Sequence, residues 1–270
     1  MRARLLKVLT LAGLTAGIGA GVAASAGPTP GFAQGGVAWP NGQVLYTALA
    51  SPHRTVVEAI RIRDNHVLHS RTLHGLYGVP LVAYDGTAGG LTRDGKQLVL
   101  ETAPGKASTR FTVLRTANFS VQQSFSLPGT WAFDALSPEG NTLYLIQILP
   151  STDTVRYLVR AYDLRLHQLV SGAIADKRET GAMTGYPLSR VTSSDGTWAY
   201  TLYQRGQPGA KPFIHALNTR DRVAVCIDLD WPGNANNLGD VRLTLSPDEQ
   251  QLVIRRVGDG KALMTVPAPS

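Results

Sequence analysis

The sequence lacks most of the features that would place it in a function class at once. The chain of 270 residues has a single cysteine, Cys226, which excludes an internal disulfide framework and any site built from several cysteines. It contains no Gly-x-Ser-x-Gly segment, the turn that carries the nucleophile of α/β-hydrolases. No stretch after the N-terminal segment repeats its apolar positions with a helical period over ten residues. These absences favour an all-β protein that lacks a recognisable catalytic motif.

A clustered basic stripe is missing as well. The chain has 26 Lys and Arg against 19 Asp and Glu, but three of the basic residues, Arg2, Arg4 and Lys7, lie in the N-terminal segment. Without that segment the balance is 23 basic against 19 acidic residues, and the basic ones are scattered along the chain. Nucleic-acid binding proteins concentrate their positive charge on one face or helix. Nucleic acid is therefore not an expected partner.

The N-terminal segment predicts export. Residues 1–26 begin with three basic residues, continue with an apolar run from Val8 to Ala24 and end in Ala24-Ser25-Ala26. This is the three-part pattern of a cleaved secretory signal peptide. We therefore expect a secreted or cell-envelope protein with no integral membrane span after cleavage. An uncleaved anchor is the alternative, because the run approaches the minimum of about 17 residues for a membrane-spanning helix.

The rest of the chain is predicted to form a flexible lead-in and one domain. Residues 27–36 are rich in Pro and Gly, which favours a flexible connection. Residues 37–270 form the predicted domain. Within it, a turn with Asp, Asn or Glu before Gly is followed by an apolar strand four times, at Gly42, Gly95, Gly140 and Gly196. A fifth copy has Glu249 at the glycine position, and successive copies are 45–56 residues apart.

Each repeat predicts four short antiparallel strands. Asp-Gly and Asn-Gly favour the positive φ angles of a tight hairpin turn. Inner strands are expected at 81–84, 131–135, 189–192 and 241–245, third strands at 56–62, 111–114, 157–164 and 213–217, and fourth strands at 66–73, 121–127, 168–174 and 223–229. Two ladders of strands in step favour a β-propeller of about five four-stranded blades over a two-sheet sandwich. The last repeat lacks a fourth strand, and the short segment Gly36–Trp39 is a candidate to provide it. The first repeat lacks a clear inner strand.

The repeat resembles a known class of bacterial propellers. The pattern S-P-[DE]-G-x-x-L-[YV] is complete in Ser137–Tyr144, partial in Ser246–Val253 and looser in Thr92–Val99 and Ser194–Tyr200. With it the chain resembles secreted β-propellers of the TolB-like and YVTN-repeat, lactonase-like superfamily over most of residues 40–266. The resemblance implies a blade architecture. Because this class contains scaffolds, surface proteins and a few enzymes, the resemblance implies no particular activity.

Four charged residues are candidates for a ligand site at one mouth of the central channel. Asp85, Asp134, Arg190 and Arg242 belong to predicted inner strands or to the loops beside them. An acid with two arginines near one channel is suited to an anionic group, because Arg offers a rigid fork of donors. The alternative is a structural ion pair between blades.

A second candidate surface is the long polar loop between the third and fourth repeats. Lys177, Arg178, Met183 and Tyr186 lie in it, and long loops on a rigid scaffold often carry recognition. We predict no catalytic residue, no metal site and no cofactor. His66 and His69, for example, point to opposite faces of one strand and do not chelate together.

These observations favour an exported, non-enzymatic and monomeric β-propeller that binds a protein or a cell-envelope polymer. The alternative is a propeller hydrolase or lyase acting on a sugar or a lactone. A glycosidase needs two carboxyl groups about 5–10 Å apart. The inner strands offer Asp134 and, less clearly, Asp85.

Overall fold

The computed structural model describes residues 31–39, 42–105, 107–151, 155–178, 181–205, 209–231 and 235–269. The predicted signal peptide and residues 27–30 of the predicted lead-in lie outside these ranges. The regular structure of the described residues is β-strand, apart from one 3-10 helix, η1 (Ala235–Asp240).

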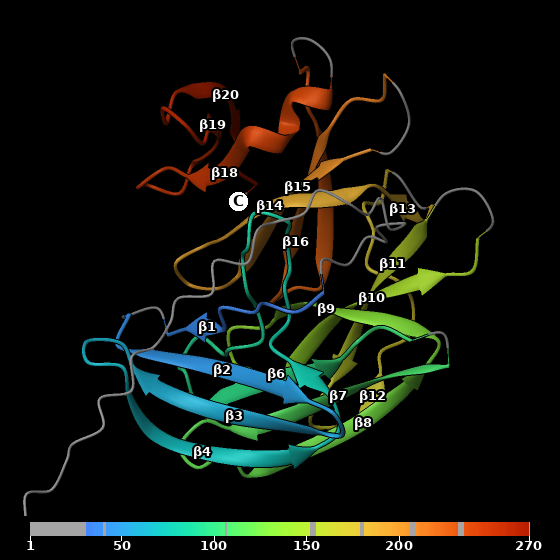
Figure 1. Ribbon diagram of the computed structural model, residues 1–270. Coiled ribbons are helices and arrows are strands. Elements are labelled where there is room, and N and C mark those ends of the chain that lie inside the picture. Colours follow the sequence, from blue (N-terminus) through green and yellow to red (C-terminus); the bar gives the residue numbers. More distant parts are fainter. Residues whose placement is uncertain are drawn as a thin grey trace, which may run out of the picture.

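The strands form five antiparallel sheets that follow one another along the chain, and we number them as blades 1 to 5 (Figure 1). Blade 1 contains β1 (Val37–Ala38), β2 (Val44–Ser51), β3 (Arg54–Arg61) and β4 (His66–His74). Blade 2 contains β5 (Tyr77–Gly78), β6 (Gln97–Thr102), β7 (Ser108–Arg115) and β8 (Val121–Pro128). Blade 3 contains β9 (Thr130–Leu136), β10 (Thr142–Leu149), β11 (Arg156–Asp163), β12 (Gln168–Leu169) and β13 (Met183–Thr184), and both short strands pair with β11. Blade 4 contains β14 (Tyr186–Thr192), β15 (Trp198–Gln204), β16 (Phe213–Asn218) and β17 (Val223–Asp228), and blade 5 contains β18 (Val241–Leu245), β19 (Gln251–Arg256) and β20 (Ala262–Pro267). The prediction of about five blades is confirmed.

The repeated turns have the geometry that their sequence predicts. Gly95, Gly140 and Gly196 adopt φ angles of 69°, 69° and 76°. Each donates its N–H to the residue three positions earlier, as in Gly140 N to Ser137 O at 2.9 Å. Glu249 adopts a φ of 58° at the fifth position, so the turn persists there without glycine. A non-glycine residue in this region is strained, which explains why the other copies use glycine.

Three strand predictions differ from the structure. The inner strand of blade 2 is β5, and residues 81–84 instead belong to a loop that makes isolated bridges such as Leu81 to Ala88. Gln168–Ile174 is a strand only at Gln168–Leu169, since the chain turns away and returns through a bridge between Ile174 and Val159. Finally, β1 pairs with β2 and provides the missing inner strand of blade 1. It does not complete blade 5, whose described strands remain three.

Apolar clusters join consecutive blades. One cluster joins blades 1 and 2, a second joins blades 2 and 3, two join blades 3 and 4, and one joins blades 4 and 5. Within the described residues, none of these clusters joins blade 5 to blade 1, and the two blades lie apart at the left of Figure 1. The ring is therefore open at this point, and blades 1 and 5 each have one face that no other blade covers.

Polar side chains reinforce several contacts between blades. The Thr55 hydroxyl of blade 1 accepts a hydrogen bond from Tyr77 N of blade 2 at 2.9 Å. Ser189 Oγ of blade 4 accepts one from Leu243 N of blade 5 at 2.8 Å. Each bond satisfies an N–H group on the inner edge of the next blade, which is costly to bury without a partner.

Candidate functional site

A hollow of about 760 Å³ lies at the end of the channel where the repeated turns open. Its floor is largely apolar, with Val82 and Phe133 buried beside Ala88 and Ala135. Its rim is formed by β1 and by turns of blades 2, 3 and 4, and it includes Arg93, Asp94, Ser137, Pro138, Ser193, Ser194 and Gly196. A concave, mostly apolar site with a few polar groups at its edge is typical of a binding site.

The floor of this hollow is built by a loop that crosses the channel. Residues 79–91 leave blade 2 and reach blade 4, where Tyr84 N and Asp85 N donate to the carbonyls of Pro187 and Leu188, each at 2.9 Å. Gly89 permits the return of the loop, because a Cβ there would lie 2.5 Å from the Phe133 ring. On another side of the loop a smaller hollow of about 520 Å³ is lined by Asp85 and Thr87 together with strands β14 and β18.

The structure brings Asp134 and Arg190 together. Asp134 of β9 is 2% exposed and forms an ion pair with Arg190 of β14, whose side chain is 5% exposed. Arg190 Nη1 also donates to the Asp134 carbonyl at 3.1 Å. The pair therefore links blades 3 and 4 and neutralises the carboxylate at the floor of the larger hollow, as the ion-pair alternative expects.

Asp85 and Arg242 lie beside the smaller hollow, which Arg190 also borders. The Asp85 carboxylate accepts hydrogen bonds from Thr87 N at 3.0 Å and from Thr87 Oγ1 at 2.7 Å, so it holds the tip of the crossing loop. Arg242 is exposed on β18, directly opposite Arg255 of β19. The four predicted residues thus occupy neighbouring places on the channel, but two of them are already paired with each other.

The four predicted residues of the second candidate surface, in the loop between blades 3 and 4, also differ in how accessible they are. Arg178 is fixed by Asp176, with Nη2 to Oδ2 at 2.6 Å, and it donates to the Cys226 carbonyl at 2.9 Å. The Arg178 side chain holds the pKa of Asp176 well below its usual range. Met183 is half-buried against the apolar clusters of blades 3 and 4, and Tyr186 is half-buried at the start of β14. Lys177 is exposed.

Arg93 is a rim residue that the sequence reasoning missed. It is exposed in the first turn of blade 2 and extends to the turn of blade 4, where a Cβ on Gly196 would lie 3.4 Å from Arg93 Cδ. Within the described residues its guanidinium has no ion pair or hydrogen bond. The sequence did contain a signal for Arg93, because it directly precedes Asp94-Gly95, and this turn is one of the repeated turns that surround the hollow.

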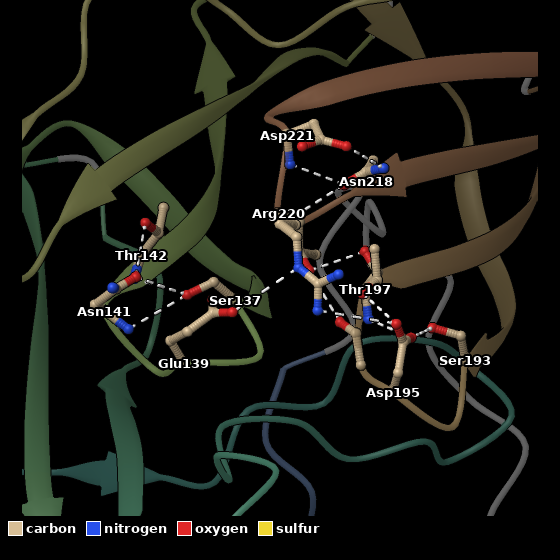
Figure 2. A network of polar contacts seen from close by, with 12 residues as sticks. Ser137, Glu139, Asn141, Thr142, Ser193, Asp195, Thr197, Asn218, Arg220 and Asp221 are labelled. Carbon is tan, nitrogen blue, oxygen red and sulfur yellow. Dashed lines mark hydrogen bonds and ion pairs between the residues drawn. The ribbon is translucent and has the colours of Figure 1, made fainter. Parts of the chain in front are cut away.

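The outer side of the rim is a network of turns (Figure 2). Arg220 extends between Glu139 of blade 3 and Asp195 of blade 4, at 3.9 Å and 4.0 Å. The Asp195 carboxylate accepts hydrogen bonds from Ser193 Oγ at 2.7 Å and from Thr197 N at 2.9 Å. Hydrogen bonding from Thr197 lowers the pKa of Asp195 to about 2. These bonds fix the turns that surround the hollow.

Two ionisable groups are buried on either side of blade 3. Glu101 of β6 accepts a hydrogen bond from Phe133 N at 2.7 Å, and burial raises its pKa to about 8. His215 of β16 lies near the Asp134–Arg190 pair, and burial lowers the pKa of its imidazole to about 4. Glu101 is therefore mostly protonated and His215 is neutral at pH 7. Neither group was singled out from the sequence, because neither lies in a turn or a motif.

In the part of the chain that the structure describes, no three His, Cys, Asp or Glu side chains gather as metal ligands. The described residues also contain no helix that is long and apolar enough to span a membrane.

The comparisons with known proteins concern the fold. No family model matches the chain, and no curated protein does. Among solved structures, the hydrazine synthase of Kuenenia stuttgartiensis matches with a TM-score of 0.50 and 14% identity, over 80% of this chain and 59% of that one. The chain is a β-propeller.

Two further matches are with TolB structures. TolB from Acinetobacter baumannii matches with a TM-score of 0.47 and 12% identity, over 89% of this chain and 55% of that one. The putative TolB from Agrobacterium tumefaciens matches with a TM-score of 0.48 and 12% identity, over 86% of this chain and 80% of that one. The propeller thus spans less than two thirds of the first two structures, and its resemblance to TolB is one of fold.

Proposed function

We propose that this propeller is an exported, non-enzymatic binding module that receives a segment of a partner protein in the hollow at its channel mouth. The observation that carries the proposal is the combination of an apolar floor with an exposed arginine at the rim, Arg93, that has no ion-pair partner among the described residues. The partner segment brings an apolar side chain to Phe133 and Val82 and a carboxylate to Arg93.

Charge supports this proposal over a hydrolase. The inner-strand carboxylate at the floor, Asp134, is buried and already paired with Arg190. A general acid or base has to reach the proton that it transfers, whereas Asp134 is buried and its charge is paired with an arginine of another blade. Arg93 by contrast is accessible and suited to a carboxylate, which its planar fork binds with two parallel hydrogen bonds.

The test is affinity capture from the envelope extract of the producing organism. The protein lacking residues 1–26 is immobilised in three variants beside the wild type. Arg93→Glu reverses the rim charge, and Ala38→Trp places an indole over the hollow from the exposed residue of β1. Arg165→Glu is the matched control, because Arg165 is also exposed but lies in an outer turn of blade 3.

We expect a protein that the wild type and Arg165→Glu retain and that Arg93→Glu and Ala38→Trp lose. Equal capture by all four forms would show that the hollow is not the binding site. Capture of a carbohydrate that becomes shorter during incubation would instead favour the hydrolase or lyase alternative.

A further inference from the structure

The face of blade 1 that points away from blade 2 forms no apolar cluster with another blade among the described residues, and it carries five apolar side chains. Strand alternation places Tyr46, Val57 and Ala59 against blade 2, where they join its apolar cluster. The opposite face, which we call the open face of blade 1, carries the apolar residues Leu45, Leu49, Val56, Ile60 and Val67 together with the polar residues Thr47, Ser51, Arg54, Glu58, Ser70, Thr72 and His74. Cross-strand pairing of Leu49 with Val56 and of Ile60 with Val67 places these side chains on one surface.

Apolar side chains on and beside this face are exposed. Leu49 is 52% exposed and Val67 is 42% exposed, and the adjacent bulge residue Leu68 is 43% exposed. The outward face of blade 5 is different, since it carries Arg242, Thr244, Arg255 and Thr265 around Val253. Exposed apolar side chains that gather on one face favour an interaction site there. The open face of blade 1 is the more apolar of the two, and it carries one positive and one negative side chain where the face of blade 5 carries two arginines.

The charges on β3 indicate which partner fits. Arg54, Val56 and Glu58 alternate outward along the strand, with opposite charges on either side of one apolar residue. Within the described residues neither Arg54 nor Glu58 has an ion-pair partner, and Arg54 donates only to Ser51 Oγ at 3.3 Å. A two-fold axis that lies in the interface and crosses β3 at Val56 would place Arg54 of each copy opposite Glu58 of the other. Such an interface contains two Arg54–Glu58 pairs. An interface between two identical surfaces requires a surface that is complementary to itself. The row of Arg54, Val56 and Glu58 meets this requirement in its charges.

We propose that two copies of this chain associate through the open face of blade 1, with Val56 and Leu49 at the axis and two Arg54–Glu58 pairs around it. Sheets that pack face to face are about 10 Å apart, a distance that an arginine and a glutamate side chain together span. Three strands of eight or nine residues cover only about 26 Å by 14 Å. Because this is small for a stable interface, we expect a dimer that dissociates in the micromolar range.

The proposal replaces the monomer that the sequence predicts, and it is independent of the function proposed for the channel hollow. The test is sedimentation equilibrium of the protein lacking residues 1–26 between about 1 and 200 µM, where a micromolar dimer passes from monomer to dimer. Glu58→Arg and Arg54→Glu each create like charges at both pairs, so each variant is expected to remain monomeric. Val56→Asp should do the same, because it buries a charge at the axis.

Mixing the two charge variants gives the decisive result. Glu58→Arg has two basic residues on the strip and Arg54→Glu has two acidic ones, so an equimolar mixture is expected to dimerise although neither variant does so alone. The double variant Arg54→Glu/Glu58→Arg should dimerise like the wild type. Thermal denaturation of each variant shows whether its fold is intact.

Three results would overturn the proposal. One is a wild type that stays monomeric up to 200 µM, which would mean that a different protein or blade 5 of the same chain covers the face. Another is a dimer that persists unchanged in all three single variants. The third is a mixture of the two charge variants that stays monomeric while the wild type dimerises.

Discussion

The two faces of blade 4 are held to their neighbours by different means. Toward blade 3, the blade presents Arg190, Tyr203 and His215, all buried, and Arg190 pairs with Asp134 across the contact. Toward blade 5, it presents Leu202 and Ile214 to a cluster of fully buried apolar residues. The alternation of side chains along one strand separates the two sets, because Leu202 and Tyr203 are consecutive and so are Ile214 and His215.

The difference teaches that similar blades do not need similar contacts. An apolar contact gains stability in proportion to the area it buries and tolerates small changes of shape. A buried ion pair adds little net stability, but it is strongly destabilising when one partner is removed. The contact between blades 3 and 4 therefore depends on specific partners, and that between blades 4 and 5 on the amount of apolar surface.

The largest effect is expected from Asp134→Ala. Removal of the carboxylate leaves the Arg190 guanidinium buried without its counter-charge, which costs about 4 kcal/mol of the free energy of unfolding. Urea denaturation at pH 7 measures the loss. The double variant Asp134→Leu/Arg190→Met removes both charges and should lose clearly less. A double variant as unstable as Asp134→Ala would refute this account of the contact.

Glu101→Gln tests the buried acid between blades 2 and 3. The pKa of Glu101 is raised to about 8 in the folded protein, so the unfolded state releases a proton between pH 4.5 and 8 that the folded state retains. The free energy of unfolding therefore falls as the pH rises through this range. Gln keeps the acceptor for Phe133 N without this penalty, and we expect it to be more stable than wild type by about 3 kcal/mol at pH 7. Equal stability of the two forms from pH 5 to 8 would show that Glu101 is not buried as described.

Leu252→Ala tests the apolar contact between blades 4 and 5. Leu252 is fully buried in that cluster, and its truncation is expected to cost about 3 kcal/mol through lost burial and the cavity left behind. Leu166→Ala, at a site that is 64% exposed, is the control and should change stability by less than about 0.5 kcal/mol. A loss that varies with pH would contradict the apolar character of this contact.

His215 should make the contact between blades 3 and 4 sensitive to acid. Its pKa is lowered from 6.5 to about 4 in the folded protein, so the unfolded state binds a proton first as the pH falls below 6.5. The contribution of His215 to stability is complete above pH 6.5 and falls by about 2 kcal/mol by pH 5. Because Glu101 acts in the opposite direction, the measurement is the stability difference between wild type and His215→Leu at pH 8 and at pH 5. A difference that does not change with pH would refute the prediction.

The smallest effect is expected from Arg220→Ala at the rim of the hollow. Arg220 and Glu139 are about half exposed, and their atoms lie 3.9 Å apart. Exposed pairs of this kind contribute less than about 0.5 kcal/mol, because water screens them and ordering the side chains costs entropy. Thermal denaturation should therefore show nearly the same midpoint as wild type. A large loss would mean that Arg220 holds the turns of blades 3 and 4 together.

The candidate site was accessible from the sequence only in part. The four predicted channel residues do lie along the channel. Turn spacing and alternation located the inner strands of Asp134, Arg190 and Arg242, whereas Asp85 lies there because residues 79–91 form a loop across the channel and not because 81–84 is an inner strand. The sequence left open whether Asp134 and Arg190 bind a ligand or pair with each other, since the two are 56 residues apart and meet only when blades 3 and 4 pack. Arg93 and Glu101 were missed for the same reason, because their roles depend on neighbours from other blades.

The sequence by itself determined the blades. Local turn chemistry at Gly95, Gly140 and Gly196 and the alternation of apolar residues act over a few positions, so they can be read along one strand. Tertiary structure decided what happens between and within the blades at long range. It placed β1 in blade 1 rather than blade 5, sent residues 79–91 across the channel and left the face with Val56 uncovered. Such choices depend on which surfaces meet, and surfaces are formed only after the strands have paired.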